Sequence, residues 1–183
     1  GRTATNAVSN GSFESGTTGW TLNKDGTGTM TADTTTAVYG VTSLKMARVG
    51  GTYHYAATAG IGVSSSTTHT VSGWHKSTRG SGSATLVVWQ YNGGVYLAGQ
   101  DKMITFTAGT HDWEFRSFTF ATAATATQII VVVASNNTDS IDYWDGIQFE
   151  IGTVATPYVS GTRTNSGYTY ASAGQINPES GSI

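Results

Sequence analysis

The stretch NAVSNGSFESGTTGWTLN, residues 6–23, places two aromatic side chains, Phe13 and Trp20, on either side of a glycine-containing turn. Large aromatic side chains are mostly buried in folded proteins, and glycine permits a tight turn between them. We therefore expect Phe13 and Trp20 to be core residues of a β-sandwich. Glu14, directly after Phe13, is then free either to bind a cation or to support a turn.

The composition fits one globular domain that is rich in strands and turns. The 183 residues include 24 Gly, 2 Pro and no Cys, and 11% of them are charged. A formal net charge of -2 gives no electrostatic reason to expect nucleic acid or an anionic membrane as partner. No apolar run approaches the roughly 18 residues that a membrane helix needs. We therefore predict neither nucleic-acid binding nor membrane insertion.

Outside this stretch, apolar residues recur at alternate positions in short runs bounded by Gly, Ser, Thr, Asn and Asp. This pattern is typical of half-buried strands, and the regular spacing of the runs predicts an all-β sandwich or barrel. We expect strands at residues 4–8, 20–22, 28–32, 43–49, 53–57, 69–76, 84–91, 95–98, 103–107, 113–120, 128–134 and 141–150.

Turn and tail signals give the domain organisation. The sequence NGG at residues 92–94 predicts a hairpin between its flanking strands, because these residues accept positive φ. After Tyr158 the chain becomes rich in Ser, Thr and Gly with little apolar alternation. We therefore predict a sandwich domain at residues 1–158 and a tail or linker at residues 159–183.

Several further stretches follow NGSFESGTTGW in a fixed order: YGVTSLKM at residues 39–46, THTVSGWHKS at 68–77, WEFRSFTF at 113–120 and DYWDGIQFE at 142–150. Together they resemble the carbohydrate-binding modules of the family 4, 9, 16 and 22 group. The stretch IGTVATPYVSGTRT that follows is similar to the ends of related modules in bacteriophage tail and virion proteins. The resemblance implies a jelly-roll β-sandwich of two antiparallel sheets with one concave face.

The resemblance also implies a structural Ca²⁺. The acids at the corresponding positions of related modules are commonly calcium ligands, and these positions are Glu14 and Asp145 here. Backbone carbonyls near the YGVTS loop would complete an oxygen shell of the kind that Ca²⁺ prefers. The alternative is that Glu14 caps a turn and that Asp145 sits in a hydrogen-bonded turn at a strand end.

A sugar site is predicted on the strand at residues 69–76, where alternation places Ser72, Trp74 and Lys76 on one face. Sugar rings offer an apolar face of C–H groups and an equator of hydroxyls, so they bind flat aromatic rings beside polar side chains. Related modules carry a stacking aromatic residue at the position of Trp74. We predict that Trp74 stacks on a sugar and that Ser72 and Lys76 bond its hydroxyls; the alternative is that Trp74 fills the core.

Gln90 and Tyr91 are further predicted sugar contacts, although alternation points them to opposite faces of their strand. Which face is concave stays open in the sequence, and Trp89 is expected to pack in the core. The strand QIIVVVAS, residues 128–135, is aliphatic on both faces, which predicts cover on both sides. The cleft is then filled, shallow or buried against a partner subunit.

No catalytic pattern stands out. The histidines at positions 54, 69, 75 and 111 show neither metal-ligand spacing nor a nucleophile motif beside them. Neighbouring acids such as Asp142 and Asp145 share one strand, whereas glycosidases need two carboxyls across a cleft. We therefore predict a protein that is not an enzyme, with His54 and His75 as surface or hydrogen-bonded polar groups.

Two non-catalytic hypotheses follow. The first is a carbohydrate-binding module for adhesion or targeting, part of a phage virion or tail or of a secreted bacterial protein. It would bind a polysaccharide or cell-surface glycan and would be extracellular or on the virion surface. The alternative is a structural or decoration module of a virion that does not bind sugar, and that uses residues 128–135 and the tail for virion or homo-oligomeric subunit contacts.

Overall fold

A computed structural model describes residues 2–165, 170–172 and 175–176 of the chain. The described residues contain strands and no helix, so that part of the chain has no membrane-spanning helix. The strands are β1 (Arg2–Thr5), β2 (Trp20–Lys24), β3 (Thr29–Asp33), β4 (Ser43–Val49), β5 (His54–Thr58), β6 (Ile61–Gly62), β7 (Thr68–Arg79), β8 (Ala84–Asn92), β9 (Val95–Tyr96), β10 (Lys102–Thr105), β11 (His111–Ala121), β12 (Gln128–Ser135), β13 (Asp139–Ile151), β14 (Thr162–Asn165), β15 (Tyr170–Ser172) and β16 (Gln175–Ile176).

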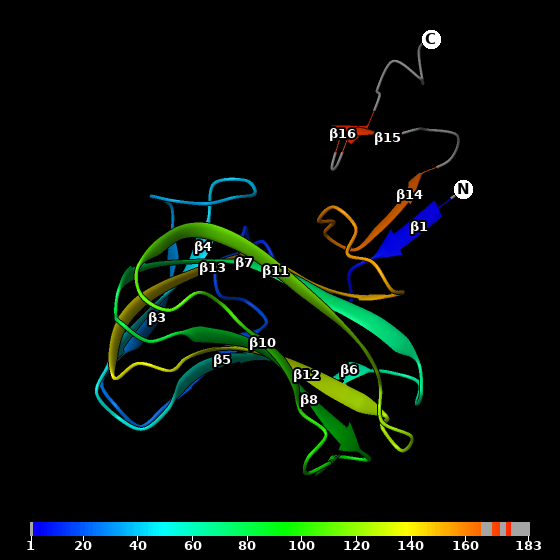
Figure 1. The fold of residues 1–183 in the computed structure, drawn as a ribbon, viewed down its shortest axis with the longest axis horizontal. Coiled ribbons are helices and arrows are strands. Elements are labelled where there is room, and N and C mark those ends of the chain that lie inside the picture. Colours follow the sequence, from blue (N-terminus) through cyan, green and yellow to red (C-terminus); the bar gives the residue numbers. More distant parts are fainter. Residues whose placement is uncertain (1, 166–169, 173–174, 177–183) are drawn as a thin grey trace.

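Two sheets lie face to face (Figure 1). The lower layer in the figure, which we call the β8 sheet, has the order β10-β8-β12-β5-β2, with β6 beside β12 and β9 beside β8. The upper layer, the β7 sheet, has the order β11-β7-β13-β4-β3. Their strand pairings are antiparallel. The predicted all-β sandwich of two antiparallel sheets is confirmed.

The strand alternation decides which side chains form the core between the sheets. Leu86 and Val88 of β8 are fully buried there, beside Val131 and Val133 of β12. The β7 sheet contributes Leu44, Met46, Val71, Trp144, Ile147 and Phe149. Each such side chain adds roughly 1.5–3 kcal/mol when it leaves water, so this apolar layer is the main stabilising contact between the sheets.

Phe13 and Trp20 are core residues, as predicted: their exposed fractions are 0% and 5%, and their ring centroids lie 5.3 Å apart. Phe13 itself is in a turn with a φ of 59°, where its amide donates to the Asn10 carbonyl at 3.2 Å. The Trp20 indole N–H donates to the same carbonyl, also at 3.2 Å. The turn therefore places both rings in the core, with Trp20 as the first residue of β2.

The two terminal segments meet beside the sandwich. β1 pairs with β14 in a separate two-stranded sheet, which stands away from the two main sheets at the upper right of Figure 1. The Ala7 amide donates to the Phe149 carbonyl at 2.9 Å, and the Asn6 side-chain amide donates to the Ile147 carbonyl at 3.0 Å. Of the predicted tail at residues 159–183, positions 166–169, 173–174 and 177–183 lie outside the described residues.

Candidate functional site

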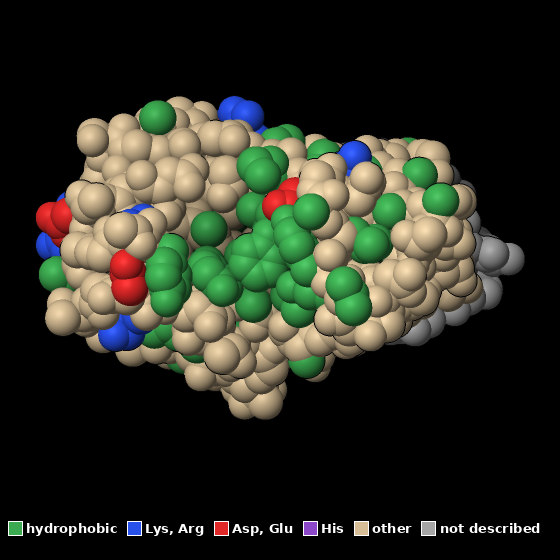
Figure 2. Space-filling model, turned by 90° about the horizontal axis from the view of Figure 1, so that it is seen from below, with side chains coloured by type: hydrophobic (Ala, Val, Ile, Leu, Met, Phe, Trp, Pro, Cys, Tyr) green, Lys and Arg blue, Asp and Glu red, His purple; other side chains and the backbone are tan. Residues whose placement is uncertain are grey.

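The outer face of the β8 sheet carries the side chains that alternate with the core residues. In β8 these include Val87 and Trp89, which lie opposite Val132 and Ile130 of β12. Figure 2 looks onto this side of the molecule and shows hydrophobic side chains gathered in the middle of the face, with an acidic side chain among them. Exposed apolar patches of this kind are candidate binding surfaces.

Aromatic rings cross this face in a row that we call the aromatic strip: Tyr53, Tyr55, Trp89, Tyr91 and Tyr96. The ring centroids of Tyr53 and Tyr55 lie 6.0 Å apart, and those of Tyr55 and Trp89 lie 5.1 Å apart in an edge-on arrangement. The Tyr91 and Tyr96 centroids are separated by 5.7 Å. The strip joins β5 to the hairpin of β8 and β9, which lies about 30 residues further along the sequence.

A cavity lies at each end of the aromatic strip. One, of about 330 Å³, is lined by Trp89, Tyr91, Tyr96 and Asp101. The other, of about 470 Å³, contains Tyr53 and Tyr55 together with polar groups of the β4 and β12 ends. Its lining is Arg48, Gly51, Thr52, Tyr53, His54, Tyr55, Ala134, Ser135, Asn136 and Thr138.

The strip explains why β12 is aliphatic on both faces. Val132 points outward but is only 1% exposed, because it packs in a small cluster with Tyr55, Trp89 and their neighbours. The predicted cover on both sides of β12 is therefore supplied on the outside by side chains of the same sheet. Trp89 was expected in the core; its ring instead lies on the outer face, since Leu86, Val88 and Gln90 are the residues of β8 that point inward.

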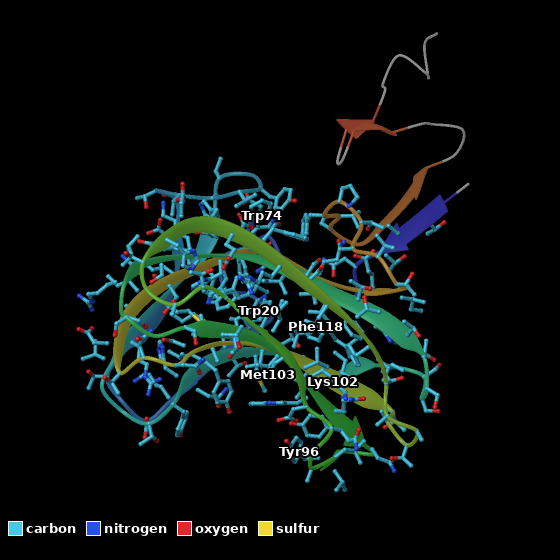
Figure 3. The ribbon with its side chains drawn as sticks, viewed as in Figure 1. Trp20, Trp74, Tyr96, Lys102, Met103 and Phe118 are labelled. Atoms are coloured by element: carbon cyan, nitrogen blue, oxygen red, sulfur yellow. The ribbon has the colours of Figure 1, made fainter. Side chains whose placement is uncertain are left out.

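The predicted sugar residues of β7 lie on the opposite side of the molecule. Trp74 is partly buried on the outer face of the β7 sheet, with its ring centroid 5.3 Å from that of Phe115. Figure 3 shows Trp74 at the upper layer and Tyr96 below the lower one. Ser72 is buried at 2% exposure, and Lys76 forms an ion pair with Asp112 at 3.5 Å.

The other two predicted sugar residues, Gln90 and Tyr91, point to opposite faces of β8, as alternation indicates. Tyr91 belongs to the aromatic strip. Gln90 is fully buried: its side-chain N–H donates to the Gln100 carbonyl at 2.7 Å, and its side-chain oxygen accepts from the Ala123 amide at 2.7 Å. The structure thus does not bring the predicted carbohydrate contacts together at one surface. The hairpin of β8 and β9 places Tyr96 beside Tyr91, and this was the signal that could have identified the strip.

The two predicted metal ligands both accept hydrogen bonds from the loop at residues 38–42. Asp145 accepts hydrogen bonds from the Val38 and Tyr39 amides at 2.7 and 2.9 Å. Glu14 accepts from the Val41 and Thr42 amides of the same loop at 3.1 and 2.9 Å. Burial, with a smaller contribution from the Glu14 charge, raises the pKa of Asp145 to about 6, although the hydrogen bonds from these amides oppose the rise. The loop at residues 38–42 thus holds both acids, and their binding of a cation stays a prediction.

The negative charge of Glu14 and Asp145 would suit a bound cation, because neither carboxylate forms an ion pair with a basic side chain among the described residues. A fully buried carboxylate beside a second one is costly unless a positive charge compensates it. The loop points backbone N–H groups at the two carboxylates, whereas the resemblance implied that backbone carbonyls of this loop would face the ion. No group of three or more acidic, His or Cys side chains in the described part of the chain is arranged to hold a metal ion, so other ligands would be backbone oxygens or water.

His75 and His54 are both buried. His75 is 1% exposed, and its Nε2 lies 2.7 Å from Asp142 Oδ1, while Nδ1 lies 3.1 Å from His111 Nε2. Burial lowers the pKa of His75, and the bond to Asp142 opposes this effect. His54 is also buried, and neither of its ring nitrogens has a hydrogen-bond partner among the described residues.

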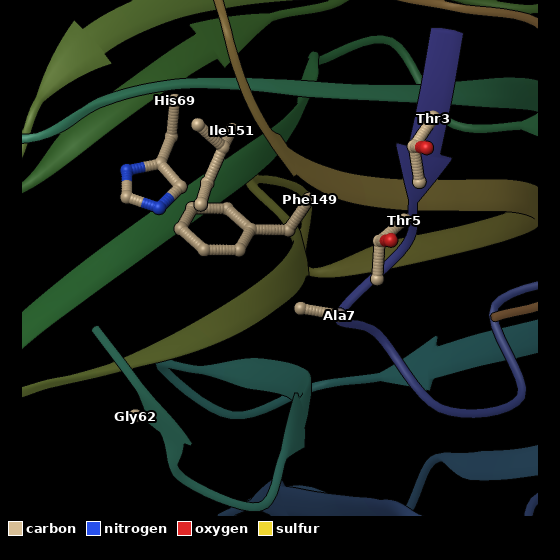
Figure 4. A pocket seen from close by; sticks show the side chains of 7 residues that line it. All are labelled: Thr3, Thr5, Ala7, Gly62, His69, Phe149 and Ile151. Atoms are coloured by element: carbon tan, nitrogen blue, oxygen red, sulfur yellow. The ribbon is translucent and has the colours of Figure 1, made fainter. Parts of the chain in front are cut away.

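Another cavity, of about 350 Å³, lies where the first strand approaches the end of the sandwich (Figure 4). The His69 ring stacks on Phe149 there, with centroids 4.5 Å apart and planes at 12°. Its lining is Thr3, Thr5, Ala7, Gly62, His69, Phe149 and Ile151. The cavity therefore lies between the first strand, β1, and the ends of β6, β7 and β13.

Residues 5–140 match the model of a family described as a carbohydrate binding domain, CBM 4/9. The chain belongs to this family. Among curated proteins, no sequence matches it. The family assignment confirms the resemblance predicted from the motifs, and the aromatic strip lies within the matched region.

Solved structures show the same fold at low sequence identity. The family 16 carbohydrate binding module 2 aligns with a TM-score of 0.62 at 21% identity, over 79% of this chain and 99% of that one. TmCBM61, solved with β-1,4-galactotriose, gives 0.60 at 14% identity over 80% and 99%. The enzymatically active domain of tailspike protein 4 of bacteriophage CBA120 gives 0.68 at 14% identity over 80% of this chain, which spans only 21% of that chain.

Proposed function

We propose that the protein binds glycans through the aromatic strip on the outer face of the β8 sheet. The strip is the observation that carries this proposal, because it offers several neighbouring aromatic rings between two cavities. Stacking on the C–H face of a sugar uses such rings, and polar groups in the adjoining cavities fix the orientation. Membership of a carbohydrate-binding domain family supports the same activity.

The proposal also covers the biological role of the protein and the place where it acts. The protein acts in adhesion or targeting, outside the cell or on a virion surface. The fold likeness to part of a phage tailspike supports this setting, as do the phage-like motifs after residue 150. The family-type calcium, held by Glu14 and Asp145, supplies positive charge that stabilises their junction and takes no part in sugar contact.

A pair of tryptophan variants tests which face binds. Trp89→Ala removes a central ring of the strip, and Trp74→Ala removes a ring of similar size on the other sheet. A stacked ring contributes on the order of 1 kcal/mol or more. We therefore expect Trp89→Ala to weaken binding to a polysaccharide panel about fivefold to tenfold in affinity electrophoresis and calorimetry, and Trp74→Ala to bind as the wild type does.

The converse result, with Trp74→Ala weakened and Trp89→Ala unchanged, would move the site to the β7 sheet. A wild-type protein that binds no glycan in the panel would instead favour the structural or decoration module. Circular dichroism of both variants controls for loss of the fold.

A further inference from the structure

The cavity at the β8–β9 end of the aromatic strip combines rings with a carboxylate. Its lining consists of Trp89, Tyr91, Tyr96 and Asp101. The Tyr91 and Tyr96 ring planes are inclined at 60°, so they form two walls of one hollow. Asp101 stands beside them on the chain segment that leads into β10.

The Asp101 carboxylate is held in place by one of these rings. The Tyr96 hydroxyl donates to Asp101 Oδ1 at 2.7 Å, and the carboxylate raises the pKa of this phenol. Among the described residues, no other side chain or backbone amide donates a hydrogen bond to Asp101. The carboxylate is therefore positioned and still has capacity for a ligand.

No basic side chain neutralises this carboxylate. None of the ion pairs of the described residues includes Asp101. Lys102 follows it directly, but Lys102 lies opposite Val88, whose side chain points into the core between the sheets. The next residue, Met103, lies opposite Val87 on the outer face. Strand alternation thus directs Lys102 away from the face that bears the cavity.

Aromatic ring faces and a carboxylate both attract positive charge. We propose that this cavity selects a glycan carrying a protonated amine, such as a glucosamine residue without its acetyl group. The amine binds Asp101 and the faces of Trp89, Tyr91 and Tyr96, while the neighbouring sugar rings continue along the strip. This inference rests on the proposed function and adds the class of sugar that the cavity prefers.

Three tetrasaccharides of similar length test the proposal by calorimetry at about pH 6, where an alkylamine is protonated. They are β-1,4-linked glucosamine, N-acetylglucosamine and glucose. We expect the glucosamine oligomer to bind about tenfold more tightly than either neutral oligomer, and added salt to reduce this preference. Asp101→Asn keeps an acceptor for Tyr96 and removes the charge, so it should abolish the preference and bind all three oligomers with similar affinity. Asp112→Asn, an exposed acid on β11 of the other sheet, is the matched control and should keep it.

The outcomes separate the two proposals. Equal affinity for all three oligomers, with loss on Trp89→Ala, would overturn the amine preference and support glycan binding by the strip. A preference for glucosamine that survives in Asp101→Asn would also overturn it. If no oligomer and no polysaccharide binds, both proposals fail.

Discussion

At the scale of single residues, Gly11 shows how closely the amino-terminal loop fits against β13. A Cβ at this position would clash with the Ile147 carbonyl oxygen. The same two residues are joined by a hydrogen bond from the Ile147 amide to the Gly11 carbonyl at 2.9 Å. The glycine therefore permits a backbone contact that positions the turn containing Phe13.

This contact predicts the effect of Gly11→Ala. The added methyl group must displace backbone, because it meets a carbonyl and no flexible side chain, so we expect a loss of about 1–3 kcal/mol in the free energy of unfolding. Gly62→Ala is the control, since a Cβ there meets no atom within 4 Å. Urea unfolding measures both variants. Equal stabilities would show that the loop can move away from β13 without cost.

The residue scale also shows what alternation can and cannot predict. Alternation places Trp89 and Tyr91 on one face of β8 and Gln90 on the other, as observed. It cannot say which face is outside, because the residues of 84–91 and 128–134 are apolar on both faces. The sugar site was predicted at Trp74 because polar residues share its face within one strand. The aromatic strip could not be recognised in this way, because its rings come from separate strands.

At the scale of elements, a buried polar network ties β7 to β13 inside the sandwich. Asp142 of β13 lies 2.7 Å from His75 Nε2 and accepts from the Ser140 hydroxyl at 2.7 Å. Ser140 in turn contacts the Ser135 hydroxyl at 2.8 Å, which brings in β12. Because these groups are buried, they depend on one another for hydrogen bonds.

Asp142→Ala should therefore be strongly destabilising. It leaves the His75 imidazole and the Ser140 hydroxyl without their common partner, at a cost of about 3–5 kcal/mol in the free energy of unfolding. Asp139→Ala on the same strand removes an exposed ion pair with Arg79 and should cost about 1 kcal/mol or less. Chemical denaturation compares the two variants. A loss for Asp142→Ala no larger than that for Asp139→Ala would show that water replaces the carboxylate.

Strand positions were largely predictable at this scale, because hydrophobic alternation and turn residues act locally. The strand at residues 43–49 was predicted with the bounds that β4 has, and the hairpin of β8 and β9 follows from its NGG turn. The pairing of β1 with β14 was not predicted. The segment after Tyr158 carries little apolar alternation, and its partner lies at the other end of the sequence.

At the scale of the whole molecule, Glu14 and Asp145 connect the beginning of the domain to its last long strand through the loop at residues 38–42. In metal-free protein, the pKa of Asp145 lies at about 6, above its ordinary value of 3.8. The native state then binds more protons than the unfolded chain between these values, so stability falls as pH rises through this window. The loss is at most about 3 kcal/mol.

Calcium should reverse this behaviour, because it binds the deprotonated acids of the native state and stabilises that state by mass action. We expect a chelator to lower the melting temperature at about pH 7 and to have little effect at about pH 4, where Asp145 is protonated. Asp145→Asn, which is neutral at both pH values, should not respond to the chelator and should lack the fall in stability between them. Calorimetric melting of wild type and variant, with calcium or with chelator, checks all of these expectations. A wild-type melting temperature at neutral pH that neither calcium nor chelator changes would rule out the ion, and the loop amides and the Gly146 amide would then compensate the two acids.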